Sequence, residues 1–444
     1  MATLTDMEHL RRVLARLSAE RPAGLGEHDG ETKHQEREGD LLRRLGLEIQ
    51  SREGKARVLV TGQIGVGKSS ELRHFFRQRV TEKRAAGFWV YCDLEKEEHP
   101  ERCGATGVFL TVFRDCWAAT RFLRENLAKQ PETIRNKFLR LEDEILERLI
   151  DWLKGERSAD GDAVTFRFGG MDFPVFLRDK GSALYLILGK ASQHEAVSER
   201  SERFGLVPDS LVNLLNKLLR WVTEVHRGRP PVLIVDHVDK IRDPSSAREV
   251  LVEVVPQWQR IEASIIMTAP YEYTLGEMRH SVESSWGKPL MVYPLEIPQL
   301  DSRTLPPIYM MIVESCGLVT LISVEGLQHL AYYSGGIPRS FVQFLIQATK
   351  EAHLAGHKRI EPADAEAVIH NAEKAYQDYG MKEMEILDQI DEKKMGLAHA
   401  VTLLRSPIGL LVMPAEAGEQ PLRVHPLVER LLDRYRIQKE RAAI

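Results

Sequence analysis

Short apolar runs alternate with amphipathic stretches between residues 57 and 293. Such alternation is typical of parallel strands joined by helices, and an apolar run without polar positions indicates a strand buried on both faces. The runs that predict strands are 57–61, 88–92, 232–236, 261–268 and 290–293, and helical spacing is found at 70–80, 107–155 and 208–226. We therefore predict an α/β fold with a parallel, doubly wound sheet.

The segments on either side of this region have helical periodicity. Two amphipathic stretches come first, and four follow after residue 300, at 5–19, 36–50, 323–333, 340–353, 362–378 and 383–404. Two apolar runs, 409–413 and 422–424, then flank a turn before a last helix from Pro426, which is the order of a winged helix. The predicted domains are an N-terminal helical extension, an α/β core, a helical lid and a C-terminal winged helix, at 1–35, 36–300, 301–380 and 381–444.

The connection at about 95–205 is longer than a strand-to-helix connection requires. Within it, residues 161–176 alternate and turn as a β-hairpin does. We interpret this region as an insertion into the core, and the sequence leaves open whether it is scaffold or functional.

Composition excludes several classes of protein. A net charge of −4 gives no global reason to expect nucleic acid or a membrane as partner. The four cysteines form no Cys-x-x-Cys pair, and the fifteen histidines show no zinc-ligand spacing. The chain has no apolar run of membrane-spanning length and no signal peptide, so we expect a soluble, cytoplasmic protein.

The first strand ends in a glycine-rich loop that opens a helix. Its sequence fits G-x-x-x-x-G-K-[ST], a phosphate-binding loop in which backbone N–H groups surround the α and β phosphates of a nucleotide. In this pattern the lysine reaches the β and γ phosphates, and the following hydroxyl ligates Mg²⁺. The predicted nucleotide-binding residues of the loop are Gly62, Gln63, Ile64, Gly65, Val66, Gly67, Lys68, Ser69 and Ser70.

The strand at 232–236 ends in an acid, Asp236. An acid at the carboxyl end of a central parallel strand lies where such sheets bind ligands, so Asp236 is predicted to hold Mg²⁺ together with Ser69. The next residue is His237, and Asp239 is the nearest carboxylate that could orient an attacking water. Thr268, at the end of its predicted strand, is a candidate contact for the γ phosphate or for that water, although a strand-end threonine is also a common turn residue.

In order, these elements resemble the STAND branch of the AAA+ P-loop ATPases, which includes NB-ARC switch proteins and relatives near Orc1/Cdc6. Gly336, Ile337 and Pro338 resemble the Gly-x-Pro motif with which the family's lid touches the nucleotide, and Arg339 follows at the sensor 2 position. The resemblance implies that His425 meets the β phosphate of ADP, although the surrounding Met-His-Asp motif is Val-His-Pro here. It also places Arg279 in the slot of an arginine finger, where a solvated surface arginine is the alternative.

The resemblance implies an ATPase with ATP and Mg²⁺ as ligands that acts as an ATP/ADP-dependent conformational or assembly switch. Because the usual second acid after Asp236 is replaced by His237, we expect slow hydrolysis. Neither an effector domain before the core nor a repeat array after it is present, so we expect a separate effector or sensor protein, as in bacterial conflict and defence systems. An ATP-dependent homo-oligomer is expected.

Two alternatives remain open. A DNA-binding ATPase similar to Orc1/Cdc6 or to a transposition regulator would use the winged helix, but Glu416 and Glu419 in its turn would repel phosphate. If Asp239 orients no water, the protein would be a scaffold that binds nucleotide without hydrolysing it.

Overall fold

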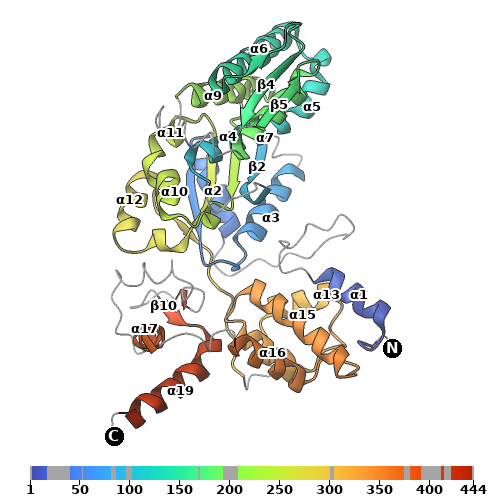
Figure 1. Cartoon of the computed structure of the whole chain (residues 1–444), viewed down its shortest axis with the longest axis vertical. Coiled ribbons are helices and arrows are strands. Elements are labelled where there is room, and N and C mark those ends of the chain that lie inside the picture. The colour runs from blue at the N-terminus through green and yellow to red at the C-terminus, as the bar shows by residue number, and fades with distance from the viewer. Residues whose placement is uncertain are drawn as a thin grey trace.

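A computed structural model gives the architecture of the chain (Figure 1). It describes residues 3–17, 41–52, 54–81, 87–96, 103–168, 171–193, 209–300, 305–374, 381–391, 412–414 and 422–442. Within these ranges no helix combines the length and the apolar character needed to cross a membrane.

A five-stranded, wholly parallel sheet forms the centre of the core, as the sequence predicts. Its order is β2 (Trp89–Asp93), β6 (Val232–Asp236), β7 (Ser264–Ala269), β1 (Arg57–Thr61) and β8 (Leu290–Met291). The predicted strand at 261–268 began three residues too early, because Ile261 caps the preceding helix. β1 and β6 are the two strands that end at the predicted nucleotide site.

Alternate side chains of the strands enter two hydrophobic clusters, one on each face of the sheet. Leu59, Leu233 and Ile265 belong to the larger cluster, whereas Val58 and Ile234 belong to the smaller one. This follows from the two-residue repeat of a strand. The smaller cluster is completed by α2 (Leu41–Ser51) and α3 (Lys68–Thr81), so both faces are covered and the sheet is doubly wound.

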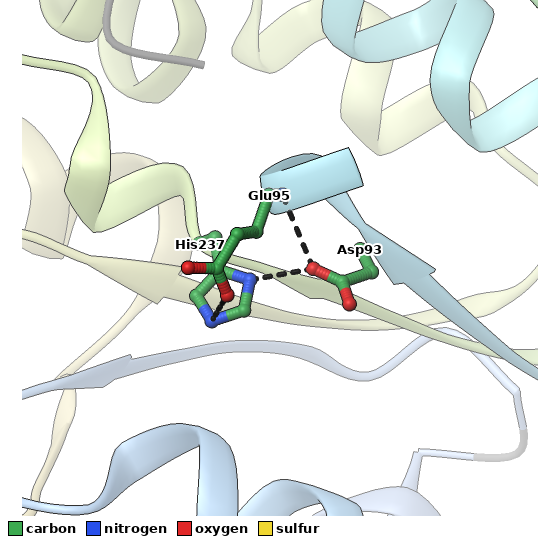
Figure 2. Close-up of side chains that lie close together, drawn as sticks. All are labelled: Asp93, Glu95 and His237. Carbon is green, nitrogen blue, oxygen red and sulfur yellow. Dashed lines mark hydrogen bonds and ion pairs between the residues drawn. The ribbon is translucent and has the colours of Figure 1, made fainter. Parts of the chain in front are cut away.

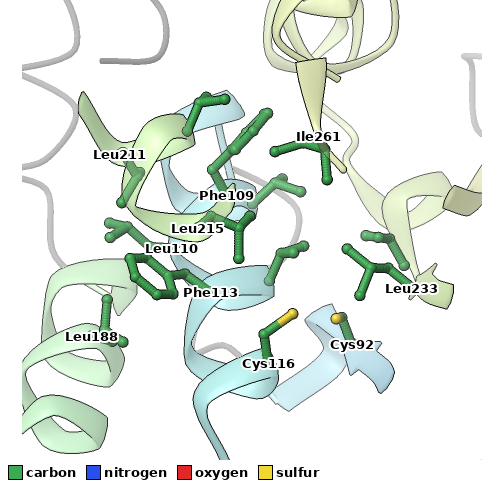
Figure 3. Packing of buried hydrophobic residues seen from close by; sticks show 14 of the residues in the cluster. Cys92, Phe109, Leu110, Phe113, Cys116, Leu188, Leu211, Leu215, Leu233 and Ile261 are labelled. Carbon is green, nitrogen blue, oxygen red and sulfur yellow. The ribbon is translucent and has the colours of Figure 1, made fainter. Parts of the chain in front are cut away.

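The predicted insertion packs on the other face and extends to the top of Figure 1. Its elements are η1 (Leu94–Lys96), α4 (Ala105–Ala119), α5 (Arg121–Glu125), η3 (Leu127–Lys129), α6 (Glu132–Leu153), β3 (Glu156–Arg157), β4 (Ala163–Phe168), β5 (Met171–Phe176) and α7 (Lys180–Gln193). The helix α9 (Asp209–Val225) follows it, where the sequence predicts a helix at 208–226. One hydrophobic cluster contains Phe109 and Phe113 of α4, Leu188 of α7, Leu215 of α9 and the sheet residue Leu233, and Phe113 lies toward Leu188 in Figure 3. The region therefore shares one core with the sheet.

The predicted hairpin is present as β4 paired with β5, with the short β3 on the outer side of β4. The remaining elements of the core are η4 (Val238–Lys240), α10 (Pro244–Arg248), η5 (Glu249–Glu253), α11 (Val255–Arg260), η6 (Tyr271–Thr274) and α12 (Gly276–Trp286).

The lid consists of α13 (Pro307–Cys316), α14 (Val324–Tyr333), α15 (Pro338–Leu354) and α16 (Pro362–Lys374). The N-terminal helix α1 (Met7–Arg16) packs with the lid rather than with the sheet: Leu4, Val13 and Leu17 enter the lid's hydrophobic cluster. The chain thus begins on the lid and then enters the core at α2, as the blue helix near the orange lid in Figure 1 shows.

The C-terminal unit contains α17 (Met381–Asp391), β9 (Val412–Pro414), β10 (Leu422–Val424) and α19 (Pro426–Ala442). β9 and β10 are antiparallel, and the unit has a small core of its own that also contacts Tyr271 and Leu275 of the α/β core. Helix, strand pair and helix occur in the predicted order, but the segment 393–405 lies outside the described residues, and the winged helix stays a prediction.

Candidate functional site

The predicted phosphate loop lies between β1 and α3. Gly62, Gly65 and Gly67 have φ values of 155°, 83° and 104°, which disfavour a side chain. A Cβ at Gly62 would also lie 2.5 Å from the Val292 carbonyl oxygen. The loop therefore has a backbone that requires glycine, as a cradle for phosphate does.

Lys68 is buried inside this loop. Its Nζ donates to the carbonyl oxygens of Gly62 at 2.7 Å and Gln63 at 3.1 Å, and lies 2.8 Å from Asp239 Oδ2. Burial alone would raise the pKa of Asp239, but the Lys68 charge lowers it below its usual value. The lysine predicted to bind phosphate is thus held by an ionised carboxylate from the turn after β6.

Ser69 and Asp236, the predicted Mg²⁺ ligands, converge on one imidazole nitrogen. His237 Nε2 lies 3.0 Å from Ser69 Oγ and 3.5 Å from Asp236 Oδ2. Asp236 also accepts hydrogen bonds from the His237 backbone N–H at 2.8 Å and from the Tyr91 hydroxyl at 2.5 Å. A hydroxyl and a carboxylate next to a phosphate loop are the ligands that Mg²⁺ prefers, so the residues fit the ion.

Sequence reasoning missed Asp93 and Arg73, which hold His237 beside Ser69 and Asp236. Asp93, at the end of β2, lies 2.6 Å from His237 Nδ1 through Oδ1 (Figure 2). Its Oδ2 lies 2.9 Å from Arg73 Nη2. Burial would raise the pKa of Asp93, but the hydrogen bond with His237 and the Arg73 charge lower it to about 2. The available signal was that β2, like β6, ends in an acid, and parallel neighbours bring such acids to one edge.

Thr268 lies in β7, one residue before its end, and is fully buried. Its hydroxyl accepts a hydrogen bond from the Val238 backbone N–H at 3.1 Å. This contact fixes the turn that carries His237 and Asp239. The predicted contact of Thr268 with the γ phosphate stays a prediction.

Comparison with protein-family models matches residues 35–261, just over half of the chain, to the AAA ATPase domain. The chain belongs to the AAA ATPase family. The predicted resemblance to AAA+ P-loop ATPases is confirmed at this level. Comparison with the curated proteins finds no match.

Solved structures similar to this AAA ATPase have low sequence identity to it. Cdc6p from Pyrobaculum aerophilum is 12% identical, with 96% of this chain and 98% of the other covered and a TM-score of 0.41. The Aeropyrum pernix Orc2 protein is 13% identical, with coverages of 94% and 98% and a TM-score of 0.44. A Walker-type ATPase of Pyrococcus abyssi is 13% identical, with coverages of 92% and 99% and a TM-score of 0.44.

The lid of this AAA ATPase touches the phosphate loop. The Arg339 backbone N–H donates to the Gly65 carbonyl oxygen at 3.3 Å, and a Cβ at Gly65 would lie 3.0 Å from Arg339 Cβ. Pro338 opens α15 at the first helical position, where its missing N–H costs nothing. The structure therefore brings Arg339 to the loop, and the predicted contact of Pro338 and Arg339 with the nucleotide stays a prediction.

His425 lies at the boundary between the lid and the C-terminal unit. Its buried ring donates from Nε2 to the Ser334 carbonyl oxygen at 3.2 Å, and Nδ1 accepts from the Leu427 N–H at 3.2 Å. Burial lowers the pKa of His425 to about 4, so the ring is neutral at physiological pH. Both nitrogens bond backbone groups here, and the predicted β-phosphate contact stays a prediction.

The predicted arginine finger, Arg279, lies on α12. It is half exposed and pairs with Glu283 of the same helix at 2.8 Å. Among the remaining loop residues, Ile64 is exposed, whereas Gln63 and Val66 are buried and Ser70 is partly buried.

Proposed function

We propose that this AAA ATPase binds Mg·ATP and acts as an ATP/ADP-dependent conformational and assembly switch. Lys68 would hold the β and γ phosphates, and Ser69 and Asp236 would hold Mg²⁺, which supplies charge neutralisation for phosphoryl transfer. The fit of the loop, the lysine and the two converging oxygen ligands supports this assignment.

One observation supports the proposed switch: the residues at 334–339 contact the phosphate loop on one side and the C-terminal unit on the other. Arg339 reaches Gly65, and Ser334 reaches His425. A phosphate that alters the position of Gly65 would thus act on the junction between α14 and α15, and through it on the C-terminal unit. A nucleotide shifts the equilibrium between two arrangements of the lid and the C-terminal unit only if it binds one arrangement more tightly than the other.

Slow hydrolysis follows from the Lys68–Asp239 pair. Phosphate must take Lys68 away from Asp239, and only then is the Asp239 carboxylate released to orient water. His237 occupies the place of the usual second acid and is itself held by Asp93. Turnover then depends on an exchange of ion pairs, which suits a switch more than a motor.

Assembly is the test of this function. Mass photometry of the full chain with ADP, ATP and a non-hydrolysable ATP analogue should show larger species only with a triphosphate, and Lys68→Ala should abolish them. Arg279→Ala should reduce assembly without reducing nucleotide affinity, because its guanidinium is half exposed and pairs with Glu283 of its own helix. Equal mass distributions in ADP and ATP would contradict the switch.

DNA binding is the second candidate, and basic side chains of α19 favour it. Arg434, Lys439 and Arg441 are exposed along this helix, with Arg434 3.5 Å from Glu373 and Lys439 3.8 Å from Asp388. Phosphate contacts by such residues make affinity fall steeply with salt. A salt-dependent anisotropy change of labelled duplex DNA with the full chain, absent in the triple alanine variant, would establish this function.

A further inference from the structure

We propose that His237 supplies a nitrogen ligand to the cation site beside the phosphate loop, and that this nitrogen raises the affinity of the site for Mn²⁺ relative to its affinity for Mg²⁺. The inference rests on the proposed function, because the same ion would contact the nucleotide. It assigns a chemical role to the residue that replaces the usual second acid.

Three oxygen ligands surround one nitrogen. His237 Nε2 lies 3.0 Å from Ser69 Oγ, 3.4 Å from Glu95 Oε2 and 3.5 Å from Asp236 Oδ2. Adjacent ligand atoms of a six-coordinate ion with bonds near ~2.1 Å are roughly 3 Å apart. Small side-chain movements would thus allow one ion to contact all four atoms.

The imidazole is already oriented for such a role. Asp93 bonds Nδ1 at 2.6 Å and is itself held by Arg73, so Nε2 faces the oxygen ligands (Figure 2). A carboxylate behind a ligating histidine is a common arrangement at metal sites, because it fixes the ring and raises its basicity. Asp93 acts here as a positioning residue.

The backbone also indicates a fixed function for His237. Its φ of 69° lies in the left-handed region, which is uncommon for residues other than glycine. This conformation follows β6 directly, and the backbone N–H of His237 bonds Asp236 Oδ1. The turn therefore stores strain to place the ring beside Asp236.

Ligand chemistry decides which ion the site prefers. Mg²⁺ is a hard cation that takes oxygen ligands, whereas Mn²⁺ retains affinity for carboxylates and also accepts an imidazole nitrogen. Zn²⁺ prefers sites with more nitrogen or sulfur, and here the other ligands are oxygens. Glu95, which is partly exposed and paired with Lys240, can exchange this lysine for the ion.

The full chain, stripped of metal with EDTA, allows a direct test. Electron paramagnetic resonance measures Mn²⁺ binding in the presence of ADP, competition with Mg²⁺ gives the ratio of the two affinities, and calorimetry measures ADP binding with each ion. The variants are His237→Glu, which replaces nitrogen by oxygen, and Glu95→Gln, with the exposed His280→Glu as the matched control.

We expect His237→Glu to reduce the preference for Mn²⁺ over Mg²⁺ at least about tenfold, and Glu95→Gln to weaken Mn²⁺ binding several-fold, with His280→Glu unchanged. An unchanged preference in folded His237→Glu would overturn the nitrogen ligand, whatever the result for Glu95→Gln, while ADP binding leaves the proposed function standing. Failure of the unmodified chain to bind ADP or ATP with either ion would overturn the proposed function, and this nucleotide-linked site with it.

Discussion

The Lys68 ammonium and the Asp239 carboxylate form a buried ion pair of 2.8 Å at the point where phosphate is expected. The pair neutralises Lys68, and under the proposed function Asp239 would compete with the nucleotide phosphate for this lysine. A buried ion is stable only with such a partner.

Replacing Asp239 by asparagine should separate affinity from turnover. Asp239→Asn removes the competitor, so ATP affinity should rise, while loss of the carboxylate should lower the turnover number about 10²-fold. Without ligand, the variant should lose roughly 3 kcal/mol of stability, because the Lys68 charge stays buried. Calorimetry, phosphate release and thermal unfolding with and without ATP measure the three effects.

The sign of the affinity change is the informative result. Lys68→Ala serves as control, since it should lose nucleotide binding altogether. Weaker ATP binding in folded Asp239→Asn would show that Asp239 supports the bound phosphate rather than competing with it.

Gly336 should be essential for docking of the lid. It has a φ of 75°, and a Cβ at this position would lie 2.1 Å from the Leu295 carbonyl oxygen. Any other residue at position 336 would therefore require the backbone to move. Its own carbonyl oxygen accepts from the Leu295 N–H at 2.7 Å. Gly336→Ala should therefore increase hydrogen exchange of the Leu295 amide and at the start of α15.

Gly356 offers a matched control for Gly336. It has the same φ of 75°, but a Cβ there would meet no atom within 4 Å. Gly356→Ala should lower the free energy of unfolding by only about 1 kcal/mol, because alanine disfavours the left-handed conformation. Equal loss of stability in the two variants would contradict the steric argument.

His425 should make stability depend on pH in a defined range. The pKa of the folded state is about 4 and the ordinary value is 6.5, so the unfolded chain binds the proton more tightly. The contribution of His425 is complete above about pH 6.5 and decreases as the pH falls toward 4, by roughly 3 kcal/mol in total. Denaturant unfolding at pH 7.5 and 5 should show about 2 kcal/mol of this loss, because pH 5 is still above the folded pKa of about 4.

His425→Gln provides the comparison, because glutamine can bond backbone groups and does not titrate. This variant should lose less stability than the unmodified chain between pH 7.5 and 5. Parallel pH profiles for the two proteins would exclude His425 as the source.

Arg57 should be essential for folding rather than for nucleotide binding. Its buried guanidinium donates to the carbonyl oxygens of Ala263 and Ile261, each at 2.6 Å, and burial lowers its pKa to about 10. Arg57→Met leaves these carbonyl groups without a donor and should cost about 3 kcal/mol by denaturant unfolding. Arg279→Met, at an exposed position, should change stability little, and a similar loss in both would contradict this assignment.

The sequence by itself determined the parallel sheet and the phosphate loop, because both depend on local pattern. β1 and β6 are continuous apolar runs, and the loop after β1 needs glycine at positions that L side chains disfavour. The positions of Ser69 and Asp236, the predicted Mg²⁺ ligands, follow directly from these two strands. The lid contact of Arg339 was likewise predictable, because a short motif marks the start of α15.

Only the tertiary structure decided the partners within the site. Asp93 and Asp239 are single acids in the sequence, and nothing local shows that one orients His237 while the other neutralises Lys68. The packing of α1 on the lid and the hydrogen bond from His425 to the Ser334 carbonyl oxygen also join residues more than ninety positions apart. Such contacts depend on which strand ends and helix faces the fold brings together, and this is a property of the whole chain.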